Sequence, residues 1–433
     1  MTVGDNCKMK RFEGKRLLEL GTTMGSVQMV QYAKDNGAYV IVADIDKPER
    51  SAAKRIADKT YMCDLKDVEG LIKIARKEKI DGVVTGASEA ILQSCRKIAE
   101  ELGLPVYFTE KLWNRFMRKD SFRKLCCKYG VSTPATYYVG KVENIGDVNE
   151  YEYPVIVKPV DASSNAGISI CNTSGELKAA LDHAAECSKT NTIIVEQYID
   201  GEEISCTYVV KNHVAKMVCM GTKYPYVDEN GLRALANAYL YPSPSIDVYM
   251  DQEDEKVKKM FVEEGINNCT VFVQGMYKDS RCYIFEAGLR MEGTGSFRIT
   301  STLCGENFLH FQVDNALGVP TEYNLDNEDP YFHGKKCVLF SQIVKGGTIA
   351  SVVGYDEVKD DDGIFASEQR RYPGDTIVAD GTLRQIMFRY MIYGDDMETV
   401  VELIKKIQGT VKAFDEDGNN LLVTSFNPGF FLG

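Results

Sequence analysis

The sequence lacks several patterns that would assign a function directly. Its thirteen cysteines contain no C-x-x-C pair, so neither a zinc site nor a disulfide framework is indicated. No run of 18 apolar residues occurs, and residues 1–15 are polar and charged, so neither a membrane span nor a secretory leader is predicted. We therefore expect a cytoplasmic protein with reduced thiols and no membrane contact.

Clustered positive charge is also missing. Lys plus Arg is 51 against 63 for Asp plus Glu, which gives a net charge of −12 with no basic block. Nucleic acid is a poor partner for such a chain, because neutralising phosphates requires grouped Lys and Arg. With 44% hydrophobic and 26% charged residues in 433, the chain is expected to fold into about three globular units.

Short apolar runs alternate with helical patterns in the first hundred residues. Strands are expected at 17–20, 39–43 and 82–85, with helices at 68–75 and 91–102. This alternation predicts a Rossmann-like parallel α/β domain over residues 1–112. Segments 21–25 and 85–89 follow strands, so they are expected at the ligand-binding edge of the sheet.

The glycine pattern after the first strand is incomplete for a dinucleotide site. A G-x-G-x-x-G fingerprint beginning at Gly21 requires glycine at two positions where Thr23 and Ser26 stand. An ordinary turn between strand and helix is therefore favoured over NAD binding.

The remainder of the chain reads as α+β. We predict a central unit over residues 113–328, with a mobile lid at about 135–195, and a C-terminal α+β domain over 329–433. The expected helices are 116–129, 176–185, 252–264 and one around 400–407. The expected strands are 155–157, 169–172, 192–196, 204–210, 215–220, 270–277, 282–286, 336–344 and 348–354. Residues 224–242 are expected to form a mobile loop.

A stretch of small residues between two expected strands, 158–169, is suited to phosphate binding. Lys158 supplies a point charge, Ser163 and Ser164 supply hydroxyl donors, and Gly167 lets the backbone approach closely. The G-K-[ST] order of a Walker loop is absent, and a strand follows instead of a helix. An ordinary hairpin loop is the alternative reading of this stretch alone.

Further nucleotide and metal ligands follow in order. In the bend of residues 192–203, backbone groups near Gln197 and Ile199 can contact an adenine edge, and Glu203 can accept from ribose hydroxyls. Gln274 and Glu286 lie on two expected neighbouring strands and can direct oxygen ligands at one Mg²⁺. Arg290 follows and can hold an anionic intermediate.

In order and spacing these residues resemble the ATP-grasp superfamily over essentially the whole chain, including D-alanine–D-alanine ligases, L-amino acid ligases, carbamoyl-phosphate synthetases and biotin carboxylases. The resemblance implies an ATP-grasp fold: a Rossmann-like domain, a two-lobed ATP-binding unit and a β-rich C-terminal domain. It also implies ATP and Mg²⁺ as cofactors, with Mn²⁺ as an alternative ion. The implied ATP contacts are Lys119, Lys158, Ser163, Ser164, Gly167, Glu196, Gln197, Ile199 and Glu203; the implied metal ligands are Gln274 and Glu286, and Arg290 is the catalytic residue.

One position departs from the family pattern. Where E-x-N-x-R is usual, this chain has Glu286, Ala287, Gly288, Leu289 and Arg290. The asparagine that would bind a second Mg²⁺ is therefore missing, and the number of metal ions is left open.

The resemblance implies an ADP-forming ligase that joins a carboxylate to an amine through an acyl phosphate. Two alternatives stay open: a bicarbonate-activating enzyme of the carboxylase or carbamoyl-phosphate type, and an ATP-binding regulator without turnover. Small-molecule substrates are the expected partners, and a homodimer is one arrangement we consider. Glu89, Arg233 and Arg298 are candidate substrate contacts, although Glu89 is equally well explained as a carboxylate at a helix N-terminus.

Overall fold

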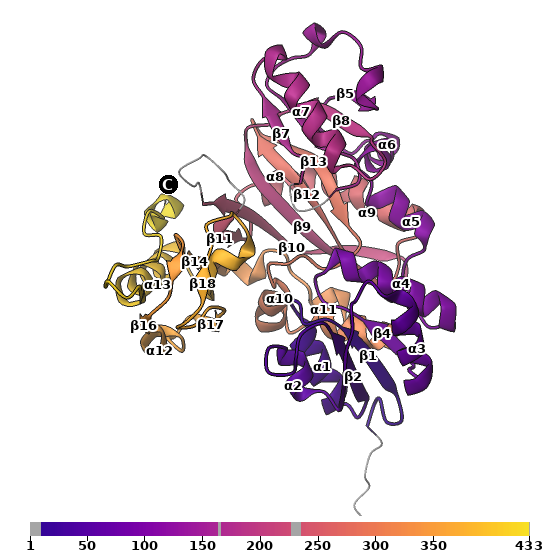
Figure 1. Cartoon of the computed structure of the whole chain (residues 1–433), viewed down its shortest axis with the longest axis vertical. Coiled ribbons are helices and arrows are strands. Elements are labelled where there is room, and N and C mark those ends of the chain that lie inside the picture. The colour runs from indigo at the N-terminus through magenta and orange to yellow at the C-terminus, as the bar shows by residue number, and fades with distance from the viewer. Residues whose placement is uncertain (1–9, 163–165, 227–234, 433) are drawn as a thin grey trace, which may run out of the picture.

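The computed structural model describes residues 10–162, 166–226 and 235–432. Its first part is a four-stranded parallel sheet in the order β3-β2-β1-β4 with helices packed on it (Figure 1). The strands are β1 (Arg16–Leu20), β2 (Tyr39–Asp44), β3 (Lys59–Met62) and β4 (Gly82–Val84). The helices are α1 (Ser26–Asp35), α2 (Ala52–Ile56), α3 (Val68–Glu78) and α4 (Glu89–Leu102).

The expected strands and helices of this part are confirmed. Strand β3 escaped prediction because its residues are only partly buried at the sheet edge, so no apolar run marks it. The parallel register aligns Leu20 with Ala43 and Glu19 with Val84, which brings the carboxyl ends of β1, β2 and β4 to one edge. Glu89 begins α4 at that edge.

Two short helices lead into the central unit. The pattern predicted a single helix over 116–129, but the structure has α5 (Glu110–Phe116) and α6 (Lys119–Tyr129). The break occurs because Arg118 has an extended backbone (φ −90°, ψ 125°), which starts a new helix at Lys119. Lys119 therefore lies at the N-terminus of α6 rather than on a helix face.

Residues 136–197 form a separate small antiparallel sheet in the order β5-β8-β6-β7. Its strands are β5 (Thr136–Gly140), β6 (Val155–Pro159), β7 (Ser169–Cys171) and β8 (Ile193–Gln197). Helix α7 (Ser174–Cys187) packs on it, and the 3₁₀ helices η1 (Val142–Asn144) and η2 (Val148–Glu150) lie in the connection after β5. The strands and the helix predicted here are confirmed, and β5 was missed. The unit lies at the end of the molecule opposite the N-terminal sheet (Figure 1).

An eight-stranded antiparallel sheet, β13-β12-β9-β10-β11-β14-β19-β17, forms the centre of the molecule. Its strands are β9 (Glu202–Lys211), β10 (Val214–Pro225), β11 (Ala236–Tyr241), β12 (Cys269–Lys278), β13 (Arg281–Gly288), β14 (Lys336–Ile343), β17 (Ile364–Gln369) and β19 (Ile386–Gly394). The prediction of a loop over 224–242 was wrong for β11. Strand β11 pairs with both β10 and β14, so the sheet continues across the predicted boundary at 328–329.

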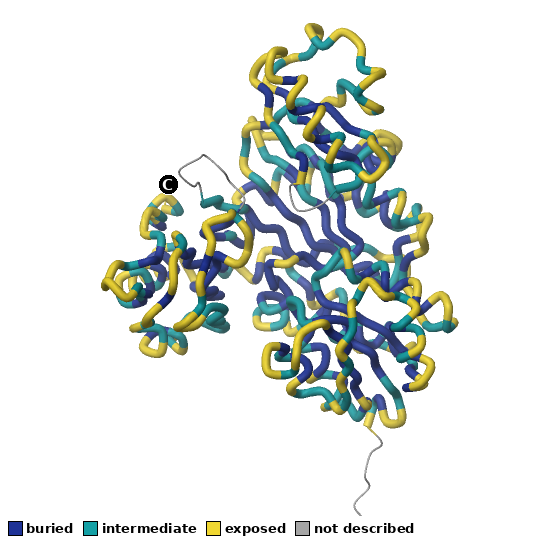
Figure 2. The backbone as a smooth tube through the Cα atoms, in the orientation of Figure 1, coloured by how far each residue is buried: buried dark blue, intermediate teal, exposed yellow. Residues whose placement is uncertain are grey.

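The remaining elements surround this sheet. They are α8 (Ile246–Tyr249), the π-helix η3 (Met250–Asp254), α9 (Glu255–Glu263), α10 (Phe297–Leu303), α11 (Phe308–Ala316), α12 (Tyr355–Val358), α13 (Met397–Thr410), the 3₁₀ helices η4 (Leu325–Asn327), η5 (Phe332–Gly334), η6 (Leu383–Gln385) and η7 (Pro428–Leu432), and the short strands β15 (Gly347–Thr348), β16 (Ser351–Val353), β18 (Thr376–Ile377) and β20 (Lys412–Phe414). The most continuous burial follows the large sheet (Figure 2). Among the described residues, no helix is both long and apolar enough to cross a membrane.

Candidate functional site

A buried ion cluster anchors the first predicted phosphate ligand. Lys158 on β6 and Glu196 on β8 lie on neighbouring antiparallel strands, and Lys158 Nζ is 2.7 Å from Glu196 Oε2. Arg123 of α6 also binds this carboxylate, with Nη2 3.0 Å from Oε2 and a second contact through Nε. Glu196 has no exposed surface. The cluster therefore ties helix α6 to the small sheet.

The two neighbouring cations determine the ionisation state of the Glu196 carboxyl group. Burial alone would raise the pKa of Glu196, but the adjacent Lys158 and Arg123 lower it to about 2. The carboxylate is thus ionised and committed to two cations, and it holds Lys158 in place. Sequence reasoning assigned Glu196 to adenine, which stays a prediction. It missed Arg123, whose place on a basic amphipathic helix gave no sign of burial.

Lys119 lies against the start of the small-residue loop. Its Nζ donates to Ala162 O at 2.8 Å, and its backbone N–H donates to Val160 O at 3.1 Å. Gly167 closes the loop at φ +71°, where an added Cβ would lie 2.7 Å from Cys187 Cβ. The predicted contacts Ser163 and Ser164 lie outside the described residues. The structure thus places Lys119 beside the segment that follows Lys158.

The bend after β8 connects the two sheets. The Gln197 backbone N–H donates to Ala135 O at 2.8 Å, and Ile199 is 6% exposed. Glu203 begins the large sheet, where its Oε2 accepts from Lys223 Nζ at 2.8 Å across the β9–β10 pair. The adenine and ribose roles of these residues stay predictions.

The predicted metal ligands lie directly opposite each other. Gln274 on β12 and Glu286 on β13 are register partners, and both side chains are half-buried. In the described part of the chain, no group of three or more His, Cys, Asp or Glu side chains is gathered to hold a metal ion unaided. Mg²⁺ commonly takes one or two protein carboxylates and completes its shell with water and phosphate oxygens. The oxygen donors of this pair fit that requirement.

Gly288 has a steric explanation. It pairs across the sheet with Phe272, and a Cβ at position 288 would lie 2.2 Å from Phe272 Cε1. The Phe272 ring also carries the guanidinium of Arg290, whose Cζ is 5.0 Å from the ring centroid. The aromatic ring occupies the space that an asparagine side chain would require, so this position supplies no side-chain ligand.

Arg290 and Glu89 come from different parts of the fold and lie within electrostatic range of each other. Burial raises the pKa of Glu89, while Arg290 lowers it and Glu286 raises it. Arg290 Nη1 donates to Met291 O at 2.8 Å, and its buried Nε has no partner among the described residues. The structure therefore brings Glu89, Glu286 and Arg290 together at the edge of the N-terminal sheet.

Arg298 belongs to a second basic group that sequence reasoning largely missed. Burial lowers the pKa of Arg298, with Glu368 and Arg370 as its charged neighbours. Arg389 is 7% exposed and its Nη1 lies 3.4 Å from Gly293 O. Among the buried atoms without a hydrogen-bond partner in the described chain are three of these neighbouring residues: Arg389 Nε, Arg370 Nη1 and Glu368 Oε2. The predicted Arg233 lies outside the described residues.

We call Arg298, Arg370 and Arg389 the arginine group. No sequence signal marked it as a unit, because its members come from α10, the end of β17 and β19. Arg389 stands in an apolar strand, where a lone arginine is normally read as a residue facing solvent. The group acquires its unpaired donors only when the C-terminal strands join the large sheet.

Comparison with known proteins agrees with this arrangement. The family model "D-ala D-ala ligase C-terminus" matches residues 135–230. A formate-dependent phosphoribosylglycinamide formyltransferase of Hydrogenovibrio crunogenus is 23% identical over 284 residues, which is 64% of this chain and 70% of that protein.

Two solved structures share the fold over nearly the whole chain. An L-amino acid ligase from Bacillus licheniformis superposes with a TM-score of 0.75 at 19% identity, covering 93% of this chain and 99% of that one. The biotin carboxylase domain of Hydrogenobacter thermophilus 2-oxoglutarate carboxylase, solved with MgADP and bicarbonate, gives 0.75 at 16% identity, covering 92% and 90%. The predicted resemblance to the ATP-grasp superfamily and the predicted fold class are confirmed.

Proposed function

We propose that this protein is an ATP-dependent ligase that joins a carboxylate to an amine and releases ADP and phosphate. The observation that carries the proposal is that two cations and two oxygen donors lie near each other, since Lys158 Nζ is 5.4 Å from the ring centroid of Phe285, the residue before Glu286. Lys119 and Lys158 supply positive charge beside the small-residue loop, and Gln274 with Glu286 supplies oxygen donors on the large sheet. A nucleotide triphosphate with its metal requires both.

The residues of the chain act by positioning and charge in this proposal. Lys119 and Lys158 hold phosphate oxygens, and Arg290 stabilises negative charge on the activated carboxylate. Gln274 and Glu286 would hold Mg²⁺, which when bound neutralises charge on the transferring phosphate. The carboxylate attacks the γ-phosphorus, an acyl phosphate forms, and the amine then displaces phosphate. No side-chain nucleophile is required.

We further propose that one substrate carries an additional anionic group that binds the arginine group. Arg389 Nε and Arg370 Nη1 are buried donors without partners in the described chain. Unpaired buried donors are costly, and a carboxylate or phosphate oxygen would satisfy them. The names of the formyltransferase relatives, which act on a phosphoribosyl compound, also support an anionic substrate.

Two alternative functions are each supported by one observation. The carboxylase neighbour was solved with bicarbonate, which favours a bicarbonate-activating enzyme as the second candidate. Gly288 stands where the family pattern has a metal ligand, and the loss of that ligand favours a regulator that binds ATP without turnover as the third candidate. Bicarbonate-dependent ADP release would identify the former, and ATP binding without turnover under every substrate pair would identify the latter.

We extend the proposal to four features of the whole protein. Residues 1–112, 113–328 and 329–433 act as three functional parts, and the small sheet of about 135–195 closes over ATP as a lid. The enzyme works in the cytoplasm. It assembles as a homodimer. Size-exclusion chromatography with light scattering tests the last point.

The experiment is a screen of carboxylate and amine pairs for ADP release, followed by trapping with hydroxylamine. An active carboxylate should yield a hydroxamate, because hydroxylamine intercepts the acyl phosphate. Glu286→Gln should reduce ADP release at least a hundredfold, whereas Glu202→Gln, an exposed carboxylate on β9, should leave it unchanged. Equal activity in both variants would contradict the assigned role of Glu286.

A further inference from the structure

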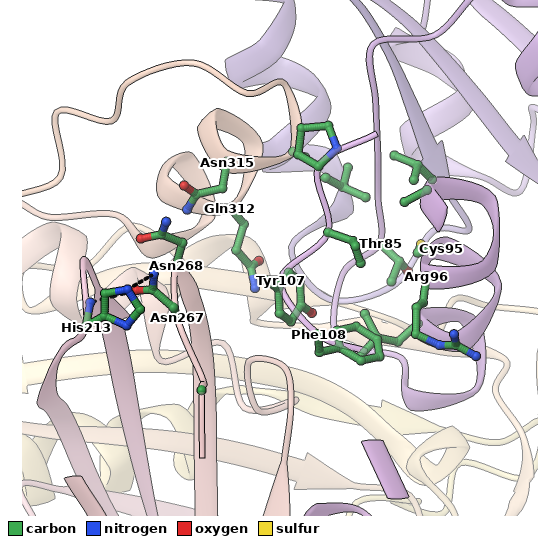
Figure 3. Close-up of a pocket in the computed structure, with 18 residues that line it drawn as sticks. Thr85, Cys95, Arg96, Tyr107, Phe108, His213, Asn267, Asn268, Gln312 and Asn315 are labelled. Carbon is green, nitrogen blue, oxygen red and sulfur yellow. Dashed lines mark hydrogen bonds between the residues drawn. The ribbon is translucent and has the colours of Figure 1, made fainter. Parts of the chain in front are cut away.

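A cavity of about 450 Å³ lies between the N-terminal sheet and the large sheet (Figure 3). Neither Lys119 nor Lys158, which hold phosphate in the proposed function, lines it. One wall is made by α4 and the segment 105–108. The opposite wall is made by the β9–β10 turn, residues 265–268 and α11. Its volume falls within the range of small-molecule sites in proteins, roughly 300–1,000 Å³.

The lining combines aromatic and aliphatic surface with carboxamides. Tyr107 and Phe108 form an aromatic side, and Gln312 of α11 extends toward Tyr107 (Figure 3). Gln312 Oε1 is buried and has no hydrogen-bond partner in the described chain. An acceptor left in this state is costly unless a ligand or water donates to it.

The cavity offers no charge to a ligand. Its ionisable lining residues are His213, whose Nε2 lies 3.3 Å from Asn267 Nδ2, and Arg96, which is 4% exposed and is the one residue of the lining with a permanent charge. The Arg96 guanidinium binds Gln93 Oε1 at 3.0 Å and the Glu100 carboxylate, and it points away from Gln312 (Figure 3). Binding an ion here would mean desolvating it without a counter-charge, so an uncharged ligand is favoured.

Two structural links join the cavity to the candidate active site. Helix α4, whose Leu92 and Cys95 line the cavity, begins with Glu89. Tyr107 Oη donates to Leu289 O at 3.0 Å, and Arg290 is the next residue. A ligand that presses on Tyr107 or α4 would therefore act on both Arg290 and Glu89.

We propose that this cavity is an effector site for a small, uncharged, planar molecule that carries an N–H donor. The ring lies against Tyr107 and Phe108, and the donor binds Gln312 Oε1. Occupancy alters ATP affinity through the Tyr107–Leu289 hydrogen bond. The binding site does not depend on the proposed ligase activity; its coupling to the active site rests on that proposal.

Benzamide is the probe, because it has an aromatic ring and an amide N–H₂, and benzoate is its charged counterpart without those donors. Trp113, the single tryptophan of the sequence, reports binding because its ring centroid is 5.6 Å from that of Phe108. We expect saturable benzamide binding by calorimetry, accompanied by a change in Trp113 fluorescence. Benzoate should bind at least tenfold more weakly.

Matched variants test the two parts of the proposal. Gln312→Leu removes the acceptor and should weaken benzamide binding about tenfold, whereas Gln31→Leu, an exposed glutamine of α1, should not change it. Absence of saturable binding, or equal affinity in the Gln312 variant, would overturn the site while leaving the ligase proposal intact.

The coupling is tested with Tyr107→Phe, which keeps the ring and removes the hydroxyl. Benzamide should change ATP affinity at least threefold in the wild type, measured by calorimetry, and should have no such effect in Tyr107→Phe although it still binds. An unchanged ATP affinity in the wild type with benzamide bound would overturn the effector role.

Discussion

At the scale of single residues, the position that departs from the family pattern is explained by its neighbour. Gly288 faces Phe272, and the Phe272 ring supports Arg290. At this position the chain therefore has an aromatic ring beneath Arg290, the proposed catalytic residue, in place of the metal ligand of the family pattern. A second metal ion, if one binds, must take its ligands from elsewhere, such as phosphate oxygens or water.

Because the Phe272 ring fills the space at position 288, we expect an asparagine there to destabilise the folded protein. Gly288→Asn should destabilise it by about 1–3 kcal/mol, because overpacking forces the Phe272 ring to move. Thermal unfolding measures the effect. Gly146→Asn is the control, because nothing lies within 4 Å of its added Cβ. An unchanged Tm together with tighter Mg²⁺ binding in Gly288→Asn would contradict this explanation.

The pH dependence of stability can distinguish two roles of Glu89, a contact to substrate and a carboxylate that stabilises the N-terminus of α4. Burial raises its pKa above 4.5, so its contribution to stability is fully present below pH 4.5 and is lost as pH rises through the folded-state value. At pH 7 the Glu89 carboxyl group therefore contributes less to the stability of the folded state than it does below pH 4.5. Glu89→Gln should raise Tm at pH 7, with a smaller difference near pH 4.5, and should reduce ligase activity.

The control for Glu89 is Glu69→Gln, an exposed carboxylate in the first turn of α3. It should lose about 0.3–1 kcal/mol at pH 7, as a helix N-terminal charge does, without loss of activity. If Glu89→Gln instead loses stability like Glu69→Gln and keeps its activity, Glu89 is a helix-capping residue.

At the scale of elements, the large sheet unites two predicted domains. Strand β14 pairs on one side with β11 and on the other with β19, so Leu339 lies opposite both Tyr239 and Met391. The C-terminal strands are therefore an extension of the central unit. This pairing also buries Arg389 beside Glu368, which creates the arginine group.

A proline in β14 tests this continuity. Leu339→Pro removes ladder hydrogen bonding in the sheet interior and should cost about 1–3 kcal/mol for each buried backbone partner left unsatisfied. Because the sheet is one unit, the unfolding transition seen by Trp113, which packs with the central core, should fall to a lower temperature as well. Val353→Pro, in the exposed two-stranded pair β16–β20, should shift that transition much less.

A Trp113 transition unaffected by Leu339→Pro would mean that residues 329–433 fold independently, as the predicted boundary supposed. The transition should be followed by fluorescence during heating, with circular dichroism confirming that each variant is folded at the start.

The elements that could be predicted from the sequence are those marked by neighbouring residues along the chain. The parallel strands of the first hundred residues are apolar runs ended by polar or glycine residues, and Lys158 precedes a stretch of small residues. Strand β11 was hidden because it lies between a polar stretch and the Pro242–Pro244 cluster, and one of its two pairing partners, β14, is about a hundred residues away. The burial of Arg123 and Arg389 likewise depends on distant segments, which one sequence cannot reveal.

At the scale of the whole molecule, the net charge of −12 contrasts with the cations gathered inside. Lys119, Lys158 and Arg123 meet where the small sheet faces the large one, and the arginine group lies farther along the same sheet. Fixed interior cations favour anionic substrates locally even when the surface is acidic. This charge distribution suits an enzyme that binds ATP together with an acidic substrate.

The most direct test of the central claim is ³¹P NMR of ATP incubated with the protein, Mg²⁺ and a mixture of carboxylates and amines. A ligase of this kind should produce ADP and inorganic phosphate only when a carboxylate is present, and Glu286→Gln should abolish their formation. AMP with pyrophosphate would show adenylation instead of an acyl phosphate. ATP left intact, although calorimetry shows that it binds, would contradict the ligase assignment and favour the regulator.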